Sequence, residues 1–254
     1  MLRSFSKQHP NFKLGKLAVK KDSRNFQLRA LIAKRLAVPP EYSFDVAHPG
    51  APLKMYANDN YGCCVISARA NQTVRFEIVE QKKVISITDK EVTNEYFRET
   101  GGSDTGLYIL DSLDQWRKTG WKVGGKTYKI KAYAQVNPKS RDDVKQAIFA
   151  EVGIAIGINL PLSAQAEINA GKPWSITSGK NSTPGSWGGH CVLVVGYTTT
   201  GPVCLTWGQR QQMTWAWFAK YCTEAYVVID AINTAKKKKL FNTKKINELL
   251  ANVA

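Results

Sequence analysis

Two residues of this chain are candidates for nucleophilic chemistry, Cys64 and His190. Cys64 follows the polar segment NDNYGC and opens residues 64–82, which contain no proline or glycine and carry apolar residues at helical spacing. A thiol at a helix N-terminus meets unpaired amides and the helix dipole, which favour a thiolate. Gly62 would let the backbone approach a substrate carbonyl closely. A lone cysteine in such a position is nevertheless more often a buried core thiol.

A thiol nucleophile also needs a base, and histidine is the usual one. The chain has three histidines: His9 in a basic segment, His48 in a proline- and glycine-containing stretch, and His190 in GSWGGHCVLVVGY. Only His190 directly adjoins an apolar run typical of a core strand. A hydrogen-bonded structural histidine at a strand edge is the alternative for His190 taken alone. We therefore choose Cys64 and His190 as the pair that folding brings together.

The segments around these residues resemble the papain-like cysteine peptidases. In that family a glutamine lies six residues before the nucleophilic cysteine and a glycine two before it, and here Asn58, Gly62 and Cys64 occupy those places. The family's His-Ala-Val motif and the strand ending Val-Gly-Tyr resemble residues 190–197, HCVLVVGY. The resemblance covers about residues 50–231. It implies that Cys64 attacks a carbonyl, that His190 moves the proton, and that Asn58 holds the oxyanion although it is one methylene shorter than glutamine.

The family's third motif, Asn-Ser-Trp-Gly, resembles residues 205–208, LTWG. Leu205 replaces the asparagine that would orient the imidazole. The resemblance therefore implies a poorly fixed tautomer of His190 and a lower rate of catalysis. Thr206 or Gln209 are candidates for that support. The resemblance also places Gly62 and Trp207 in the cleft wall.

More narrowly, the segments NDNYGCC, LPLSAQ, GSWGGH and TWGQRQQMTW resemble papain-like proteins encoded by bacteriophages, where an aspartate commonly occupies the position of Cys63. Two functions follow from the resemblance. One is a cysteine peptidase or amide hydrolase that acts on a peptide or protein through an acyl-enzyme, carried in a phage particle. The other is an inactive papain-like scaffold that serves as a structural or binding component of the virion, for which Leu205 and the basic ends argue.

The order of elements predicts an α+β chain with two lobes and a cleft between them. Helical patterns dominate residues 51–125, whereas residues 126–231 contain several strand patterns. We expect a helical lobe followed by an antiparallel sheet or barrel lobe.

Basic segments flank this region. The formal net charge is +16, with ten Lys or Arg in the first 35 residues and a run at Lys236–Lys239. Residues 1–50 are interpreted as an arm that lies on another surface, and residues 232–254 as a tail with an amphipathic helix opening near Asn242. Such charge favours nonspecific contact with an anionic partner, either a viral assembly or nucleic acid.

Other features narrow the class of protein. Five cysteines are an odd number and two of them are adjacent, which favours a reduced setting over a disulfide framework. A zinc site from Cys63, Cys64, His190 and Cys191 is disfavoured because adjacent ligands suit tetrahedral coordination poorly, so no metal and no cofactor are expected. The chain shows neither an apolar run long enough to span a membrane nor a secretory signal. We expect a cytoplasmic protein of a bacterial host, associated with a virion.

Overall fold

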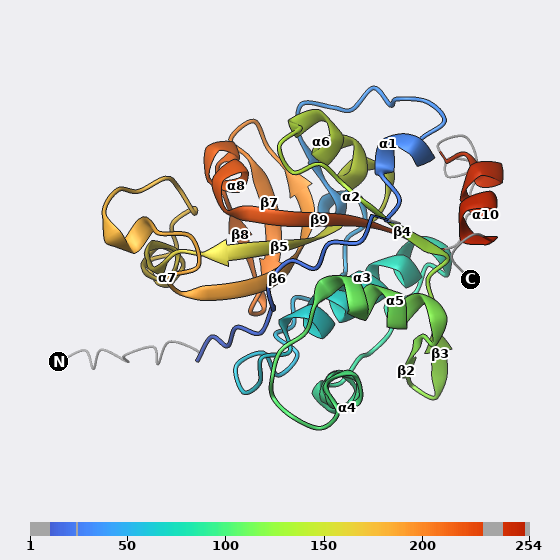
Figure 1. Ribbon diagram of the computed structural model, residues 1–254, viewed down its shortest axis with the longest axis horizontal. Helices are drawn as coiled ribbons and strands as arrows, with labels where there is room; N and C mark the ends of the chain where they lie inside the picture. Colours follow the sequence, from blue (N-terminus) through green and yellow to red (C-terminus); the bar gives the residue numbers. More distant parts are fainter. Residues whose placement is uncertain (1–10, 24, 231–240, 252–254) are drawn as a thin grey trace.

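The computed structural model describes residues 11–23, 25–230 and 241–251. The chain folds into a helical lobe and a sheet lobe that face one another, as Figure 1 shows. His9, which we do not choose as the base, and the basic run Lys236–Lys239 lie outside the described residues. Among the described residues, no helix has the length and apolar character to cross a membrane.

The helical lobe contains three helices and one hairpin. The helices are α3 (Cys64–Glu80), α4 (Asp89–Thr100) and α5 (Ile109–Lys118), and the hairpin pairs β2 (Trp121–Val123) with β3 (Lys126–Tyr128). Helix α3 begins at Cys64, as the apolar spacing predicts, and packs against strand β6 (Gly188–Tyr197) of the other lobe. The candidate nucleophile therefore sits on the helix that joins the two lobes.

Helix α3 is buried around most of its circumference, and its two buried arginines are paired with acids. The Arg75 side chain is completely buried and its Nε lies 2.9 Å from Asp45 Oδ1. Arg69 Nη1 lies 2.9 Å from Glu95 Oε1 of α4. Because an unpaired buried charge is strongly destabilising, these ion pairs hold the helix in one orientation.

The ends of α4 follow from local sequence. The Thr88 hydroxyl accepts from the Glu91 backbone N–H at 3.2 Å, while the Glu91 carboxylate accepts from the Thr88 N–H at 2.8 Å. This is a capping box. Gly101, with φ of 69°, ends the helix in the left-handed conformation that glycine adopts without strain.

Helix α5 begins at Ile109, five residues after Asp104. Asp104 accepts hydrogen bonds from the Gly62 N–H at 2.9 Å and from the Tyr96 hydroxyl at 2.6 Å. The carboxylate thus ties the loop before Cys64 to helix α4.

The second lobe is built on a seven-stranded antiparallel sheet with the order β4-β9-β5-β6-β7-β8, in which β1 also pairs with β6. Its strands are β1 (Tyr42–Ser43), β4 (Ala132–Gln135), β5 (Ile154–Leu160), β6 (Gly188–Tyr197), β7 (Pro202–Thr206), β8 (Gln209–Gln212) and β9 (Cys222–Ile229). Strands β4 and β8 end this path without pairing with each other. The described strands therefore form an open antiparallel sheet, which confirms the first of the two expected forms, a sheet or a barrel.

Both faces of the sheet are covered. Alternate residues of β6 point to opposite faces: Leu193 and Val195 join the apolar cluster that includes α3, whereas Val192 and Val194 join a second cluster. Helices α6 (Arg141–Ala150) and α8 (Trp215–Tyr221) contribute to the second cluster, as does α7 (Leu162–Asn169), which is followed by the short 3-10 helix η1 (Lys180–Ser182). This double coverage explains why β5 and β6 read as nearly continuous apolar runs.

The described part of the expected basic arm is integrated into the fold. It contains the short helices α1 (Leu28–Leu31) and α2 (Phe44–Ala47), and β1 pairs with β6. Part of its charge is neutralised within the chain, because Arg29 and Lys20 each form an ion pair at 2.8 Å with an acid of the domain.

The C-terminal helix α10 (Thr243–Ala251) also docks on the chain itself. Its first turn is capped by the Asn242 side chain, which accepts from the Lys245 N–H at 3.0 Å. Ile246 is fully buried in the same cluster as Leu28 and Leu31 of α1. Figure 1 shows α10 beside α1 at one edge of the molecule.

Candidate active site

The residues singled out from the sequence converge on one small cavity between the lobes. It is lined, among others, by Asn58, Cys64, His190, Leu205, Thr206 and Trp207. The Cys64 and His190 side chains come from different lobes, since Cys64 opens α3 and His190 lies in β6. Each residue is only 1% exposed. The thiol and the imidazole therefore share an environment, but that environment is closed.

The imidazole of His190 is held on two sides. Its Nε2 lies 2.7 Å from the Thr206 hydroxyl, and its ring stacks on the Trp207 indole with centroids 4.1 Å apart and an angle of 10°. Trp207 adopts φ of 45°, an unusual conformation for a non-glycine residue and one that clusters at functional sites. When Nε2 carries the ring proton and donates it to Thr206, Nδ1 is left as the basic nitrogen.

Nδ1 is the ring atom available for chemistry. It is buried and has no hydrogen-bond partner within the part of the chain that the structure describes. Burial lowers the pKa of His190 from 6.5 to about 3, so the ring is neutral at pH 7. His190 and Cys64 line the same cavity. A neutral imidazole with an unpartnered nitrogen is the state that a general base requires.

The Cys64 thiol is also neutral in this closed state. Burial raises its pKa to about 11, although the backbone amides of Cys191 and Gly15 act in the opposite direction. These amides lie close enough to favour a thiolate, but loss of solvent outweighs them. The adjacent Cys63 is buried apart from this site, with its sulfur 3.4 Å from the Tyr56 carbonyl and 3.5 Å from the Ser67 hydroxyl.

Of the two residues expected near the oxyanion, Asn58 lines the cavity, whereas Gly62 lies in the loop before Cys64 and is not among the lining residues. Asn58 is buried at the cavity, and its Nδ2 donates to the Tyr61 carbonyl at 3.0 Å. An amide nitrogen carries two hydrogens, so one remains for a ligand oxygen. The bond to Tyr61 holds the shorter side chain in place.

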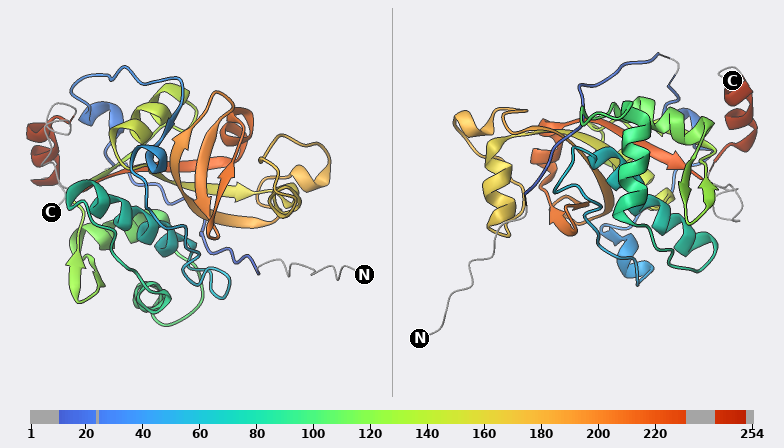
Figure 2. Two further views of the ribbon diagram at one scale, coloured as in Figure 1. Left: turned by 180° about the vertical axis from the view of Figure 1, so that it is seen from behind. Right: turned by 90° about the horizontal axis from the view of Figure 1, so that it is seen from below.

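Residues 11–17 occupy the groove between the lobes. Lys13 N–H donates to the Asn58 carbonyl at 3.0 Å, and the Lys13 carbonyl accepts from Trp207 Nε1 at 3.2 Å. Phe12 stacks on the outer side of Trp207 with centroids 4.4 Å apart. In Figure 2 the N-terminal ribbon, drawn in blue, runs across the molecule between the two lobes.

The same segment pairs with backbone on both sides of the groove. Lys16 N–H donates to the Gly189 carbonyl at 3.1 Å, next to His190. Leu107 of the helical lobe donates to the Gly15 carbonyl at 2.8 Å and accepts from the Leu17 N–H at 3.0 Å. An extended segment bound through its main chain is how peptide-binding grooves hold a ligand. We call residues 11–17 the groove segment.

The groove segment is the main difference between expectation and structure. The sequence suggests an arm on another surface, whereas residues 11–17 lie on the chain's own candidate site. The alternation of apolar and basic residues in FKLGKLAV, with a glycine at its centre, is a strand-like signal that could have indicated a bound extended segment. The residues of that segment carry no local pattern that identifies the surface to which it binds.

Of the two candidates for imidazole support, the contact belongs to Thr206. Gln209 stands opposite Thr206 in the β7–β8 register. Leu205 points to the apolar cluster shared with α3 and lines the cavity. The hydroxyl of Thr206 thus holds the ring although Leu205 offers no polar atom.

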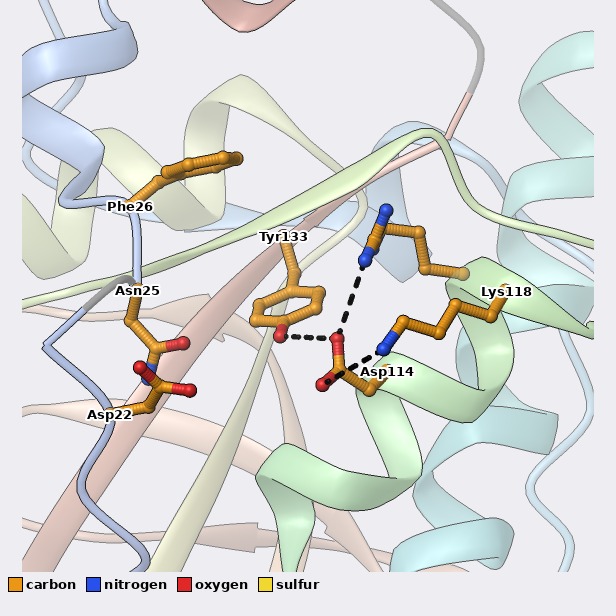
Figure 3. Close-up of a pocket in the computed structure, with 7 residues that line it drawn as sticks. Asp22, Asn25, Phe26, Asp114, Lys118 and Tyr133 are labelled. Atoms are coloured by element: carbon orange, nitrogen blue, oxygen red, sulfur yellow. Dashed lines mark hydrogen bonds and ion pairs between the residues drawn. The ribbon is translucent and has the colours of Figure 1, made fainter. Parts of the chain in front are cut away.

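A metal site, or a second hollow with catalytic groups, would be an alternative to this site. Among the described residues, no set of three or more His, Cys, Asp or Glu side chains is arranged to hold a metal ion. Figure 3 shows a separate hollow lined by Asp22, Asn25, Phe26 and Tyr133, where Asp114 accepts from the Tyr133 hydroxyl at 2.9 Å. Arg117 and Lys118 neutralise that carboxylate at 3.7 and 4.0 Å. No thiol or imidazole lines this hollow.

Solved structures share this architecture. Xylellain, a cysteine protease from Xylella fastidiosa, matches with a TM-score of 0.65 and 18% identity over 89% of this chain and 98% of its own. The bromelain protease of Ananas comosus in complex with the E64 inhibitor matches with a TM-score of 0.56 and 12% identity over 76% and 100%. The proform of the ragweed cysteine protease Amb a 11 matches with a TM-score of 0.60 and 12% identity over 89% and 70%. The chain therefore has the papain-like fold.

Comparisons of the sequence alone do not assign the chain to a family. No protein-family model matches the chain, and no curated protein matches it in sequence.

Proposed function

We propose that this protein is a cysteine peptidase that uses Cys64 as nucleophile and His190 as base. The observation that carries the proposal is that one cavity joins a thiol at a helix N-terminus to an imidazole whose Nε2 is held by Thr206 and whose Nδ1 is free. The papain-like fold and the likeness to solved cysteine proteases support it.

The reaction follows from these atoms. His190 Nδ1 takes the proton of Cys64 Sγ, and the thiolate attacks the carbonyl carbon of the scissile amide. Asn58 Nδ2 and the Cys64 backbone N–H donate to the oxyanion. The protonated His190 then gives its proton to the leaving amine, which leaves a thioester on Cys64. Water, deprotonated by His190, hydrolyses the thioester and restores the free thiol.

In the structure this machinery is closed by the groove segment. Gly15 is packed against Gly62, and its amide acts on the Cys64 thiol. We therefore infer a latent peptidase that works after residues 11–17 leave the groove. Displacement returns solvent to both groups, so the pKa of Cys64 falls and that of His190 rises toward values at which proton transfer between them is easy.

The test is covalent labelling combined with peptide cleavage. A full-length Gly15→Leu variant, whose new side chain has no room beside Gly62, should react with an epoxide or vinyl-sulfone probe at Cys64 and hydrolyse a protein substrate such as casein. Mass spectrometry locates the adduct. Cys64→Ser should abolish both reactions, and His190→Asn should lower both by at least a hundredfold. An open variant that forms no Cys64 adduct under conditions that label papain-like enzymes would refute the proposal.

The second candidate is a catalytically inactive scaffold that serves as a structural or binding component of a phage particle. The closed site favours it, because Cys64 and His190 are each 1% exposed. The phage context itself rests on the resemblance of NDNYGCC and GSWGGH, as does a place in the cytoplasm of a bacterial host or in its virions. Residues 11–23 and 25–45 are part of the fold, so binding of an anionic assembly or DNA is best tested by charge reversal at exposed lysines rather than by trimming. Particle association without any Cys64 chemistry would favour the scaffold.

A further inference from the structure

The groove segment places one side chain in a pocket of its own, beside the candidate catalytic pair. Lys16 Nζ lies 3.2 Å from Glu224 Oε1, and both side chains are only 1% exposed. Lys16 Nζ also donates to the Leu17 carbonyl at 2.9 Å. A buried ion pair is costly to assemble and is tolerated only where geometry is good. Most of the lysines that the structure describes are exposed to solvent and avoid that cost. The burial of Lys16 is therefore unusual and points to a specific function of its pocket.

The pocket is made by the sheet rather than by the segment. Gly157 of β5 stands opposite both Cys191 of β6 and Glu224 of β9, so these positions share one face. A Cβ on Gly157 would lie 2.3 Å from Lys16 Cε and 2.6 Å from Glu224 Cγ. The lysine stem therefore fills the space that this glycine leaves open.

The mouth of the pocket lies one residue from the base. A Cβ on Gly189 would lie 2.2 Å from the Lys16 carbonyl oxygen, and the Gly189 carbonyl accepts the Lys16 N–H. Gly189 immediately precedes His190. A peptide that takes the place of the groove segment would thus find main-chain partners at Gly189 and Leu107, and one of its side chains would enter this pocket.

The carboxylate of Glu224 lies at the floor of the pocket, where the Lys16 ammonium stabilises its charge. Glu224 also accepts from the Tyr226 hydroxyl at 3.2 Å. Burial raises the pKa of Glu224, and the Lys16 ammonium opposes that shift. When the groove segment leaves, the carboxylate loses its counter-charge in a site with little solvent, which is unfavourable. A substrate ammonium or guanidinium would restore the pair, whereas an apolar or acidic side chain would not.

We propose that the Glu224 pocket is the specificity pocket of this protein and that it selects a lysine or arginine side chain of the substrate peptide. The proposal rests on the proposed function and names its substrate class. The groove segment is then a ligand analogue whose Lys16 shows what the pocket accepts.

The first experiment profiles cleavage by the full-length Gly15→Leu variant. Peptide libraries vary each of the four positions before the cleaved bond in turn. We expect lysine and arginine to be preferred at least tenfold over leucine and glutamate at one of these positions. Glu224→Gln in the same background should remove that preference while labelling of Cys64 by the epoxide probe continues. Asp111→Asn, which removes the exposed partner of Lys20 instead, should leave the preference unchanged.

These readouts separate the two proposals. Labelling of Cys64 and cleavage without a basic preference at any position would overturn the pocket proposal and leave the peptidase intact. A chain that never labels would overturn the peptidase.

A second experiment needs no catalysis. In the full-length chain, hydrogen exchange at the Lys16 and Leu17 amides reports how tightly the groove segment is bound. Lys16→Arg should keep the protection, and Lys16→Met should lower it at least tenfold. Combining Lys16→Met with Glu224→Gln should recover much of it, because the carboxylate is then no longer left unpaired. A Lys16→Met chain as protected as the parent would overturn the pocket proposal.

Discussion

Gly15 of the groove segment and Gly62 of the loop before Cys64 lie in direct backbone contact. A Cβ on Gly15 would come within 1.7 Å of the Gly62 carbonyl oxygen, and a Cβ on Gly62 would come within 2.9 Å of the Leu14 carbonyl oxygen. The two backbone segments can approach so closely because both positions are glycine and carry no Cβ. This contact brings the groove segment onto Cys64, so closure of the site depends on two residues without side chains.

Substitution at Gly15 should open the groove in a graded way. Gly15→Ala introduces the colliding Cβ, and overpacking of this kind costs about 1–3 kcal/mol, which corresponds to roughly a five- to hundredfold loss of closed state. Hydrogen exchange at Leu17 and Leu107 measures the opening. Ala18→Leu enlarges the side chain at the exposed position that follows the groove segment and should leave the exchange unchanged. Equal exchange in the parent and in Gly15→Ala would show that Gly15 does not control closure.

Alkylation of Cys64 should depend steeply on pH in the parent chain. Only the thiolate reacts, and burial raises the Cys64 pKa to about 11, so the rate should rise tenfold per pH unit through neutral pH and level off near 11. Displacement of the groove segment lowers that pKa, so Gly15→Leu should react faster at pH 7 and reach its plateau at lower pH. Iodoacetamide rates followed by tandem mass spectrometry distinguish Cys64 from Cys63. Identical profiles in the two chains would contradict the assignment of burial to the groove segment.

Removal of the Thr206 hydroxyl should impair activity more than stability. Thr206→Val keeps the side-chain shape but removes the 2.7 Å hydrogen bond to His190 Nε2. A hydrogen bond contributes about 0.5–1.5 kcal/mol, so in the Gly15→Leu background we expect kcat to fall roughly three- to tenfold. Thr206→Ser keeps a hydroxyl and should restore most of the rate. Urea unfolding provides the stability control, and a kcat unchanged by Thr206→Val would remove Thr206 from its positioning role.

Asp104 should stabilise the loop that presents Cys64. Asp104→Ala removes acceptors from the Gly62 N–H and the Tyr96 hydroxyl, two hydrogen bonds that together contribute about 1–3 kcal/mol. We expect a lower urea midpoint and slower labelling of Cys64 in the open variant. Asp89→Ala, at an exposed position in the first turn of α4, removes a carboxylate from the same lobe and should cost less than 1 kcal/mol. Similar losses of folding stability in Asp104→Ala and Asp89→Ala would argue against a special role for Asp104.

Much of the scaffold could be predicted from the sequence because its signals are local. The apolar spacing after Cys64 predicts α3, and the apolar run after His190 predicts β6. Each signal depends on residues a few positions apart, which interact within one helix or strand. The two residues expected to do chemistry could be named in the same way.

Only the tertiary structure decided how these parts are used. It selected Thr206 over Gln209 as the imidazole's partner, placed Asp104 against the Gly62 N–H, and placed Lys16 against Glu224. The last pair joins residues 208 positions apart in the chain, 224 minus 16. Contacts over such separations are set by how two lobes and an extended segment fit together, and neither partner carries a local pattern that names the other.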